Sequence, residues 1–120
     1  MNWLQLTSLE QLDQIAERSK AVPCLLFKHS TRCSISAMAK HRLEAEWDFS
    51  PDAVEPYYLD LIAFRPVSSA IAERFSVYHE SPQVLLVKDG VCFYDASHLD
   101  ITVAELKAAL SSPEYAGTSK

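Results

Sequence analysis

Apolar residues recur along this chain in two patterns, which predict two kinds of secondary structure. Four segments carry apolar residues at the spacing of one helix face, and they begin near Leu9, Ile35, Pro66 and Val103. Their expected buried positions are Leu9, Leu12, Ile15 and Ala16, then Met38, Ala39, Leu43 and Trp47, then Val67, Ile71, Ala72 and Phe75, and finally Val103, Leu106 and Leu110. Five short apolar runs are typical of strands, and they cover residues 3–6, 22–28, 57–61, 83–88 and 91–96.

Local signals support the ends of these elements. Thr7 and Thr102 each stand three residues before a glutamate, which is the spacing of a capping box at a helix start. Asp89-Gly90 separates the last two strands and predicts a type I′ hairpin turn. The element order is therefore β-α-β-α-β-α-β-β-α. Such alternation predicts an α/β fold, in which a mixed sheet has helices on both faces.

Composition and charge restrict the classes of protein. A chain of 120 residues is expected to form one domain, here residues 1–112, followed by a loose tail at residues 113–120. Hydrophobic residues make up 48% and charged residues 22%, as in an ordinary soluble globular protein. The net charge of −5 argues against nucleic-acid or anionic-membrane binding, because both surfaces repel an acidic protein. No stretch approaches the roughly 18 apolar residues that cross a membrane.

The first residues and the cysteines predict a compartment. Residues 1–6 lack the basic segment and the long apolar run of a signal peptide. The three cysteines, at positions 24, 33 and 92, are odd in number and form no close pair. They fit a reducing cytoplasm better than a disulfide framework, so we expect a cytoplasmic protein.

Cys33 is the candidate reactive residue, because it lies where the second predicted strand meets the second predicted helix. A helix N-terminus, with Lys28, His29 and Arg32 close in sequence, is expected to favour the thiolate over the thiol. Ser36 occupies the position that would complete a Cys-x-x-Cys pair. Its hydroxyl is expected to donate a hydrogen bond to the Cys33 thiolate, but it cannot form a disulfide. A second thiol, free or from another cysteine, must therefore resolve any mixed disulfide on Cys33.

The order of elements, with a cysteine between the second strand and the second helix, resembles the thioredoxin fold from Trp3 to Leu110. Ser81-Pro82, immediately before the strand at residues 83–88, strengthens this resemblance. Thioredoxin-like proteins carry a cis-proline at that place, facing the active cysteine and offering backbone groups to the substrate. The resemblance therefore implies a cis peptide bond before Pro82.

Residues 28–36 read Lys-His-Ser-Thr-Arg-Cys-Ser-Ile-Ser and give a more specific match. They resemble the active segment of the YtxJ-type monothiol bacilliredoxins, Lys-His-Ser-Thr-x-Cys-Pro-Ile-Ser, with Ser34 as the departure. The resemblance implies a thiol-disulfide oxidoreductase that takes bacillithiol from bacillithiolated proteins, with bacillithiol as co-substrate and no bound cofactor. It implies catalytic roles for Cys33 and Ser36. The residues it assigns to substrate contact are Lys28, His29, Thr31, Arg32, Ser34, Ser81 and Pro82.

Two other functions stay open at this point. A monothiol glutaredoxin would use glutathione or bridge an iron–sulfur cluster. Against this function, the chain has only two glycines, Gly90 and Gly117, and lacks the paired glycines that glutaredoxins use beside glutathione. A thioredoxin-fold binding module would use the groove without thiol turnover. We expect Cys24 and Cys92 to be core or sheet residues, and we expect no metal, because no Cys-x-x-Cys or His-x₃-His spacing occurs.

Overall fold

The computed structural model describes residues 1–112, and the predicted tail at residues 113–120 lies outside this described part. The predicted element order is confirmed, with one added 3₁₀ helix, η1. The elements are β1 (Leu4–Gln5), α1 (Glu10–Arg18), β2 (Cys24–His29), α2 (Ser34–Glu46), β3 (Glu55–Asp60), α3 (Arg65–Arg74), β4 (Gln83–Lys88), β5 (Val91–Ser97), η1 (His98–Asp100) and α4 (Val103–Leu110).

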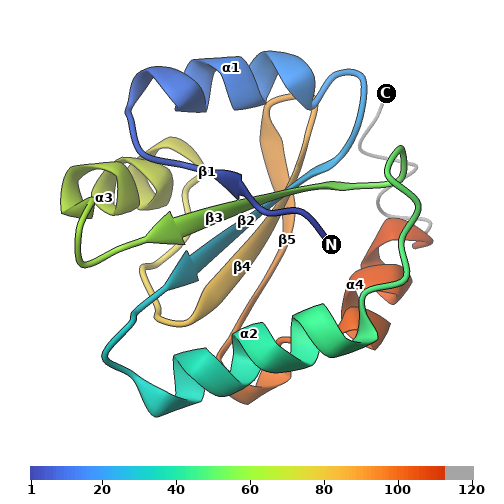
Figure 1. Cartoon of the computed structure of the whole chain (residues 1–120). Coiled ribbons are helices and arrows are strands. Elements are labelled where there is room, and N and C mark those ends of the chain that lie inside the picture. Colours follow the sequence, from blue (N-terminus) through green and yellow to red (C-terminus); the bar gives the residue numbers. More distant parts are fainter. Residues whose placement is uncertain (113–120) are drawn as a thin grey trace.

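The five strands form one mixed sheet in the order β1-β3-β2-β4-β5. β1 and β2 both run parallel to β3, whereas β4 is antiparallel to β2 and β5 is antiparallel to β4. Figure 1 shows α1 and α3 on one face of the sheet and α2 and α4 on the other. This arrangement is the predicted α/β fold and has the strand order of the thioredoxin fold.

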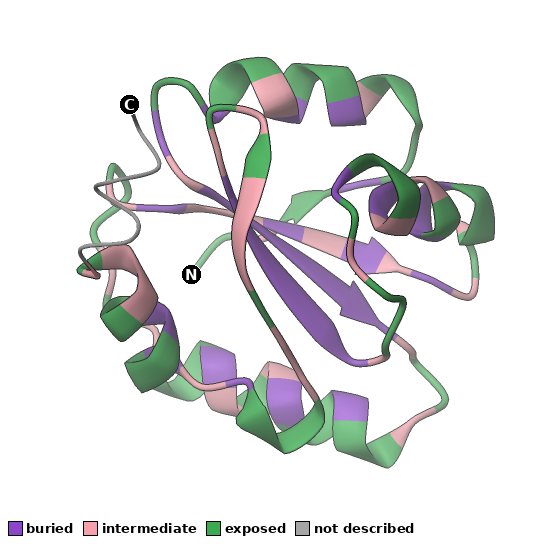
Figure 2. Ribbon diagram, turned by 180° about the vertical axis from the view of Figure 1, so that it is seen from behind, coloured by how far each residue is buried: buried purple, intermediate pink, exposed green. Residues whose placement is uncertain are grey.

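The central strand β2 separates two hydrophobic cores, and all six of its residues are buried (Figure 2). Successive side chains of a strand point to opposite faces, so Cys24 and Leu26 pack with α1 and α3, while Leu25 and Phe27 pack with α2 and α4. The same alternation directs Lys28 towards α3. The face of each β2 side chain thus decides which of the two cores it joins.

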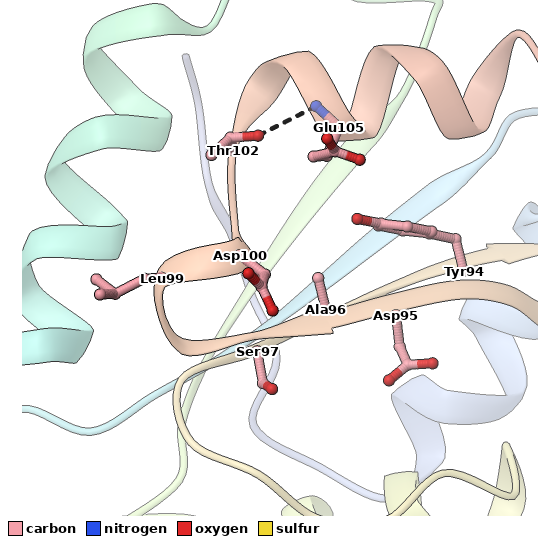
Figure 3. A pocket seen from close by; sticks show the side chains of 8 residues that line it. All are labelled: Tyr94, Asp95, Ala96, Ser97, Leu99, Asp100, Thr102 and Glu105. Atoms are coloured by element: carbon pink, nitrogen blue, oxygen red, sulfur yellow. Dashed lines mark hydrogen bonds between the residues drawn. The ribbon is translucent and has the colours of Figure 1, made fainter.

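The two predicted capping boxes have different outcomes. The capping box predicted at Thr7 is wrong, because α1 begins at Glu10 and has no side-chain cap. Instead, the Gln11 side chain accepts hydrogen bonds from the Thr7 and Ser8 amides, at 2.7 and 3.0 Å. At α4, the Thr102 hydroxyl accepts the amide of Glu105 at 3.1 Å, so this cap is confirmed (Figure 3). The glutamine side chain thus binds amides that precede α1, and it does not accept the first-turn amide that a threonine cap would accept.

The hairpin between β4 and β5 has the predicted turn. Asp89 and Gly90 have φ values of 55° and 76°, and a type I′ turn requires positive φ at both central positions. The Gly90 amide also donates to the Ser19 hydroxyl at 2.8 Å, which fastens the turn to the end of α1. Within residues 1–112, no helix is both long and apolar enough to cross a membrane.

Candidate active site

Cys33 forms the entry to α2. It has extended backbone angles, with φ −112° and ψ 122°, and α2 begins at the next residue. Its amide donates to the Ser30 carbonyl at 3.2 Å, and its own carbonyl accepts the Ala37 amide at 3.1 Å. The side chain is partly exposed and carries a free thiol. The loop therefore holds a reachable sulfur at a helix N-terminus, where unpaired amides stabilise negative charge.

The Ser36 hydroxyl is fully buried beneath this loop and binds two partners. It accepts the Ser30 amide at 3.0 Å and lies 2.7 Å from Nδ1 of His29. These partners differ from the expected one, the sulfur of Cys33. The hydroxyl has one hydrogen, so it donates either to His29 or to a third group. Ser36 thus joins the end of β2 to the first turn of α2.

His29 decides where the Ser36 hydrogen goes. Burial lowers the pKa of His29, and the nearby Lys40 charge lowers it further, so the ring is neutral at neutral pH. Where Nδ1 is unprotonated, it accepts the Ser36 hydrogen and none remains for Cys33. Where Nδ1 carries the ring proton, it donates to Ser36 and frees the hydroxyl hydrogen for the thiolate. The structure gives the Ser36 hydroxyl the partners Ser30 and His29, and the predicted bond to the Cys33 sulfur is not among them.

Lys28 does not lie where the sequence analysis expected it. It was assigned to substrate contact, but its side chain is 0% exposed and points towards α3. Its Nζ atom has no hydrogen-bond partner, and burial lowers its pKa to about 8. The predicted strand at residues 22–28 already included Lys28, but its pattern does not show which face each side chain takes; in the structure β2 continues to His29 and Lys28 is buried. Lys28 can influence the site only through its charge.

Of the other predicted contact residues, His29 is 6% exposed at the end of β2, and the rest lie around the loop. Thr31, Arg32 and Ser34 are exposed beside Cys33. The Ser81–Pro82 peptide bond is cis, as the resemblance implied. The Pro82 carbonyl already accepts the His98 amide at 3.0 Å. The sheet places this segment near the loop, because β4 starts directly after Pro82 and pairs antiparallel with β2.

Sequence reasoning missed an apolar surface next to Cys33. Ile35 and Met38 are 41% and 53% exposed on the first turns of α2. Met38 was expected on the buried face, and that expectation is wrong. Ser36, Ala39 and Leu43 form the buried stripe instead, which turns Met38 outward. The apolar spacing alone could not show this, because a buried serine takes the place of one apolar residue.

Cys24 and Cys92 lie at the far end of the sheet. Both are aligned with Val87 of β4, whereas Gln83, at the other end of that strand, pairs with Lys28. Cys24 is fully buried, and burial raises its pKa to about 12; burial raises the pKa of Cys92 to about 11. The length of β2, about 16 Å, separates Cys24 from the Cys33 end. Neither thiol is positioned to resolve a disulfide on Cys33.

A large hollow lies elsewhere and is acidic. It is lined by β5, η1 and the start of α4, and the carboxylates of Asp95, Asp100 and Glu105 surround it (Figure 3). Leu99 points from η1 towards α2. Among residues 1–112, no group of three or more histidine, cysteine or acidic side chains is arranged to hold a metal ion.

The fold, and a partly exposed cysteine at the start of α2 with a serine three residues later, define a thioredoxin-fold protein with a monothiol site. The chain is similar over 88% of its length to a solved structure provisionally described as an oxidoreductase with a thioredoxin fold, with 32% identity, a TM-score of 0.74 and 91% of that chain covered. Two thioredoxins show the same fold at lower identity. That of Malassezia sympodialis (Mala s 13) is 17% identical over 92% of this chain and 89% of its own, with a TM-score of 0.72. That of Fasciola hepatica is 18% identical over 89% and 95%, with a TM-score of 0.68.

The family model described as "Monothiol bacilliredoxin BrxC" matches residues 4–106. The chain therefore belongs to the monothiol bacilliredoxin family. This match includes the Cys33 loop and every described residue of the candidate site.

Proposed function

We propose that this protein removes bacillithiol from protein mixed disulfides through Cys33, in the cytoplasm. The observation that carries the proposal is a partly exposed cysteine at the start of α2, in a chain of the monothiol bacilliredoxin family, with a buried serine at the position of a second thiol. A thiol at such a position can attack a disulfide but cannot complete an internal one.

The reaction consists of two thiol-disulfide exchanges. The Cys33 thiolate attacks the bacillithiol sulfur of the mixed disulfide, the bond to the substrate protein breaks, and the protein leaves as a thiolate. Cys33 then carries bacillithiol. A second bacillithiol thiolate attacks that bacillithiol sulfur, which releases bacillithiol disulfide and restores the Cys33 thiolate. Each step exchanges one disulfide bond for another, so no electron acceptor or donor beyond the thiols is needed.

The residues of the loop have distinct tasks in this scheme. Ser36 stabilises the Cys33 thiolate when His29 donates to its hydroxyl. Thr31, Arg32 and Ser34 contact the incoming mixed disulfide, with the Ser81–Pro82 segment opposite. Ile35 and Met38 provide apolar contact for the substrate protein. Free bacillithiol resolves the adduct, because Cys24 and Cys92 lie at the other end of the sheet and keep their protons.

Mass spectrometry of the purified chain after exposure to oxidised bacillithiol, glutathione and coenzyme A, in parallel, tests the proposal. We expect one bacillithiol adduct, on Cys33, and transfer that Cys33→Ser abolishes while Cys24→Ser and Cys92→Ser retain most of it. Transfer that survives Cys33→Ser would refute the proposal. A preference for glutathione would indicate a glutaredoxin-like activity, and no adduct at all would indicate a binding module.

A further inference from the structure

A cavity of about 330 Å³ opens beside the first turns of α3. Its lining residues are Leu61, Arg65, Ser68, Ser69, Ala72 and His79. Most of them belong to α3. Leu61 directly follows β3, and His79 belongs to the segment that leads to the cis peptide bond before Pro82.

This cavity lies at the same end of the sheet as Cys33. β2 and β3 are parallel, and their carboxyl ends lead to the Cys33 loop and to α3. The Leu61 amide donates to the His29 carbonyl at 3.0 Å, so the two chain segments leave the sheet side by side. Figure 1 shows the β2–α2 loop and α3 at the end towards which both arrowheads point. A small molecule bonded to the Cys33 sulfur therefore lies at the same end of the sheet as this cavity.

The ammonium of Lys28 lies in the layer between the sheet and α3. Its side chain shares a face with Leu59, which packs against Val67 and Ile71 of α3. Together with the Ser81 hydroxyl, Nζ of Lys28 is one of two described buried side-chain atoms without a hydrogen-bond partner. The pKa of His79 is lowered by burial and next by the Lys28 charge. Lys28 therefore acts electrostatically on a residue of the cavity wall.

The charges around this cavity favour an anion. Arg65 is exposed at the start of α3, and a helix N-terminus adds partial positive charge. Glu80 is the carboxylate that acts on both Lys28 and His79, and it lies 3.4 Å from Nε2 of His98. The hollow beside β5, η1 and α4 differs in this respect, because it is surrounded by carboxylates. Arg65 is thus the charged side chain in the lining of the α3 cavity, and the described residues of this lining include no carboxylate, in a chain whose net charge is −5.

We propose that the α3 cavity binds the carboxylate of the small thiol that exchanges at Cys33, with Arg65 facing the anion and Lys28 adding its charge from behind the wall. Burying an ammonium without a partner destabilises the folded protein, and an anion close by offsets that cost. This inference rests on the proposed function for the thiol chemistry and adds to it the part of the thiol that is recognised. The anionic thiols to test are bacillithiol and glutathione, both of which carry carboxylates.

A stopped-flow exchange reaction measures this recognition. Cys33 is first converted to its 2-pyridyl disulfide, with one label per chain verified by mass spectrometry. An added thiolate then attacks the Cys33 sulfur, the bond to the pyridyl sulfur breaks, and coloured pyridine-2-thione leaves as the new disulfide forms. Second-order rate constants are measured for bacillithiol, for glutathione and for uncharged 2-mercaptoethanol. The readout is the ratio of each anionic rate constant to that of 2-mercaptoethanol, which cancels general effects on the reactivity of Cys33.

We expect Arg65→Gln to lower both ratios about fivefold at low salt, as removal of one unit charge near 4 Å predicts. Lys28→Met should lower them in the same direction, and added salt should reduce the Arg65 effect. Arg74→Gln, in the last turn of the same helix, is the matched control, and its ratios should stay within about twofold of the original protein.

The proposal requires both Arg65→Gln and Lys28→Met to lower the ratios. An unchanged ratio in either variant, or an equal fall in Arg74→Gln, refutes it. Failure of the proposed function has a different signature. A protein that reacts with glutathione and not with bacillithiol would contradict that function, while the glutathione ratios would still decide whether the cavity binds a carboxylate.

Discussion

Substitution of Lys28 by methionine tests the energetic cost of a buried, unpaired ammonium. Methionine has nearly the same length and no charge. The pKa of Lys28 falls from 10.5 to about 8 in the folded protein, because burial removes water from the ammonium while the Glu80 charge opposes the fall. A difference of one between two pKa values corresponds to about 1.4 kcal/mol. Protonated Lys28 therefore destabilises the folded protein by about 3 kcal/mol near neutral pH, and Lys28→Met should be more stable by that order.

The added stability of Lys28→Met should depend on pH, and the direction follows from the protons that the folded and unfolded states bind. Between pH 8 and 10.5 the unfolded chain keeps the Lys28 proton while the folded protein has lost it. The unfolded state then binds more protons, so this group makes the original protein more stable as pH rises. The advantage of Lys28→Met should be about 3 kcal/mol at pH 7, about 2 kcal/mol at pH 9 and below about 0.5 kcal/mol at pH 10.5.

Urea unfolding of both proteins at a series of pH values provides the assay. Cys24 and Cys92, whose pKa values are raised by burial, make both proteins less stable above pH 9, because only the unfolded chains lose those protons. Subtracting the two free energies of unfolding at each pH removes this common effect. A difference that is constant from pH 7 to 10.5, or a Lys28→Met protein less stable at pH 7, would show that the ammonium is not isolated in the core.

Two further substitutions test individual hydrogen bonds. Ser36→Ala should destabilise the protein by about 1–3 kcal/mol in urea unfolding, because the Ser30 amide loses its hydrogen-bond partner in a buried place. The control Ser34→Ala, at an exposed position, should change stability by less than about 0.5 kcal/mol. Equal effects of the two substitutions would contradict the buried network. Thr102→Ala should cost about 1 kcal/mol through loss of the α4 cap, and Thr102→Ser should restore most of it. A Thr102→Ser protein as unstable as the alanine variant would mean that the hydroxyl is not the cause.

The fold could be predicted from the sequence because its signals are local and agree with one another. The Asp89-Gly90 turn and the strand at residues 83–88 appear in the structure as expected. The η1 helix was missed, since its residues carry no helical apolar pattern and it is held by the Pro82 carbonyl, which a distant segment provides. Contacts between segments far apart in the sequence leave no local pattern.

The candidate site was only partly predictable for the same kind of reason. The motif located Cys33 at the start of a helix, as the structure has it. The motif could not show that Lys28 lies beneath α3, because all residues of β2 are buried and no alternation of polar and apolar residues marks its two faces. It also could not show that Ser36 binds His29, since residues seven apart meet only when the loop folds back. Hydrogen-bond partners and side-chain direction therefore required the structure.

If Cys33 carries a small thiol as proposed, the separation of the cysteines along the sheet determines how long the protein stays modified. A domain with a second thiol beside the first discharges an adduct on its own, at a rate independent of its surroundings. Here Cys24 and Cys92 are a strand length away and keep their protons, so an adduct on Cys33 persists until a thiol arrives from solution. Its lifetime is then inversely proportional to the concentration of that thiol. The fraction of chains carrying an adduct therefore reports the state of the surrounding thiol pool.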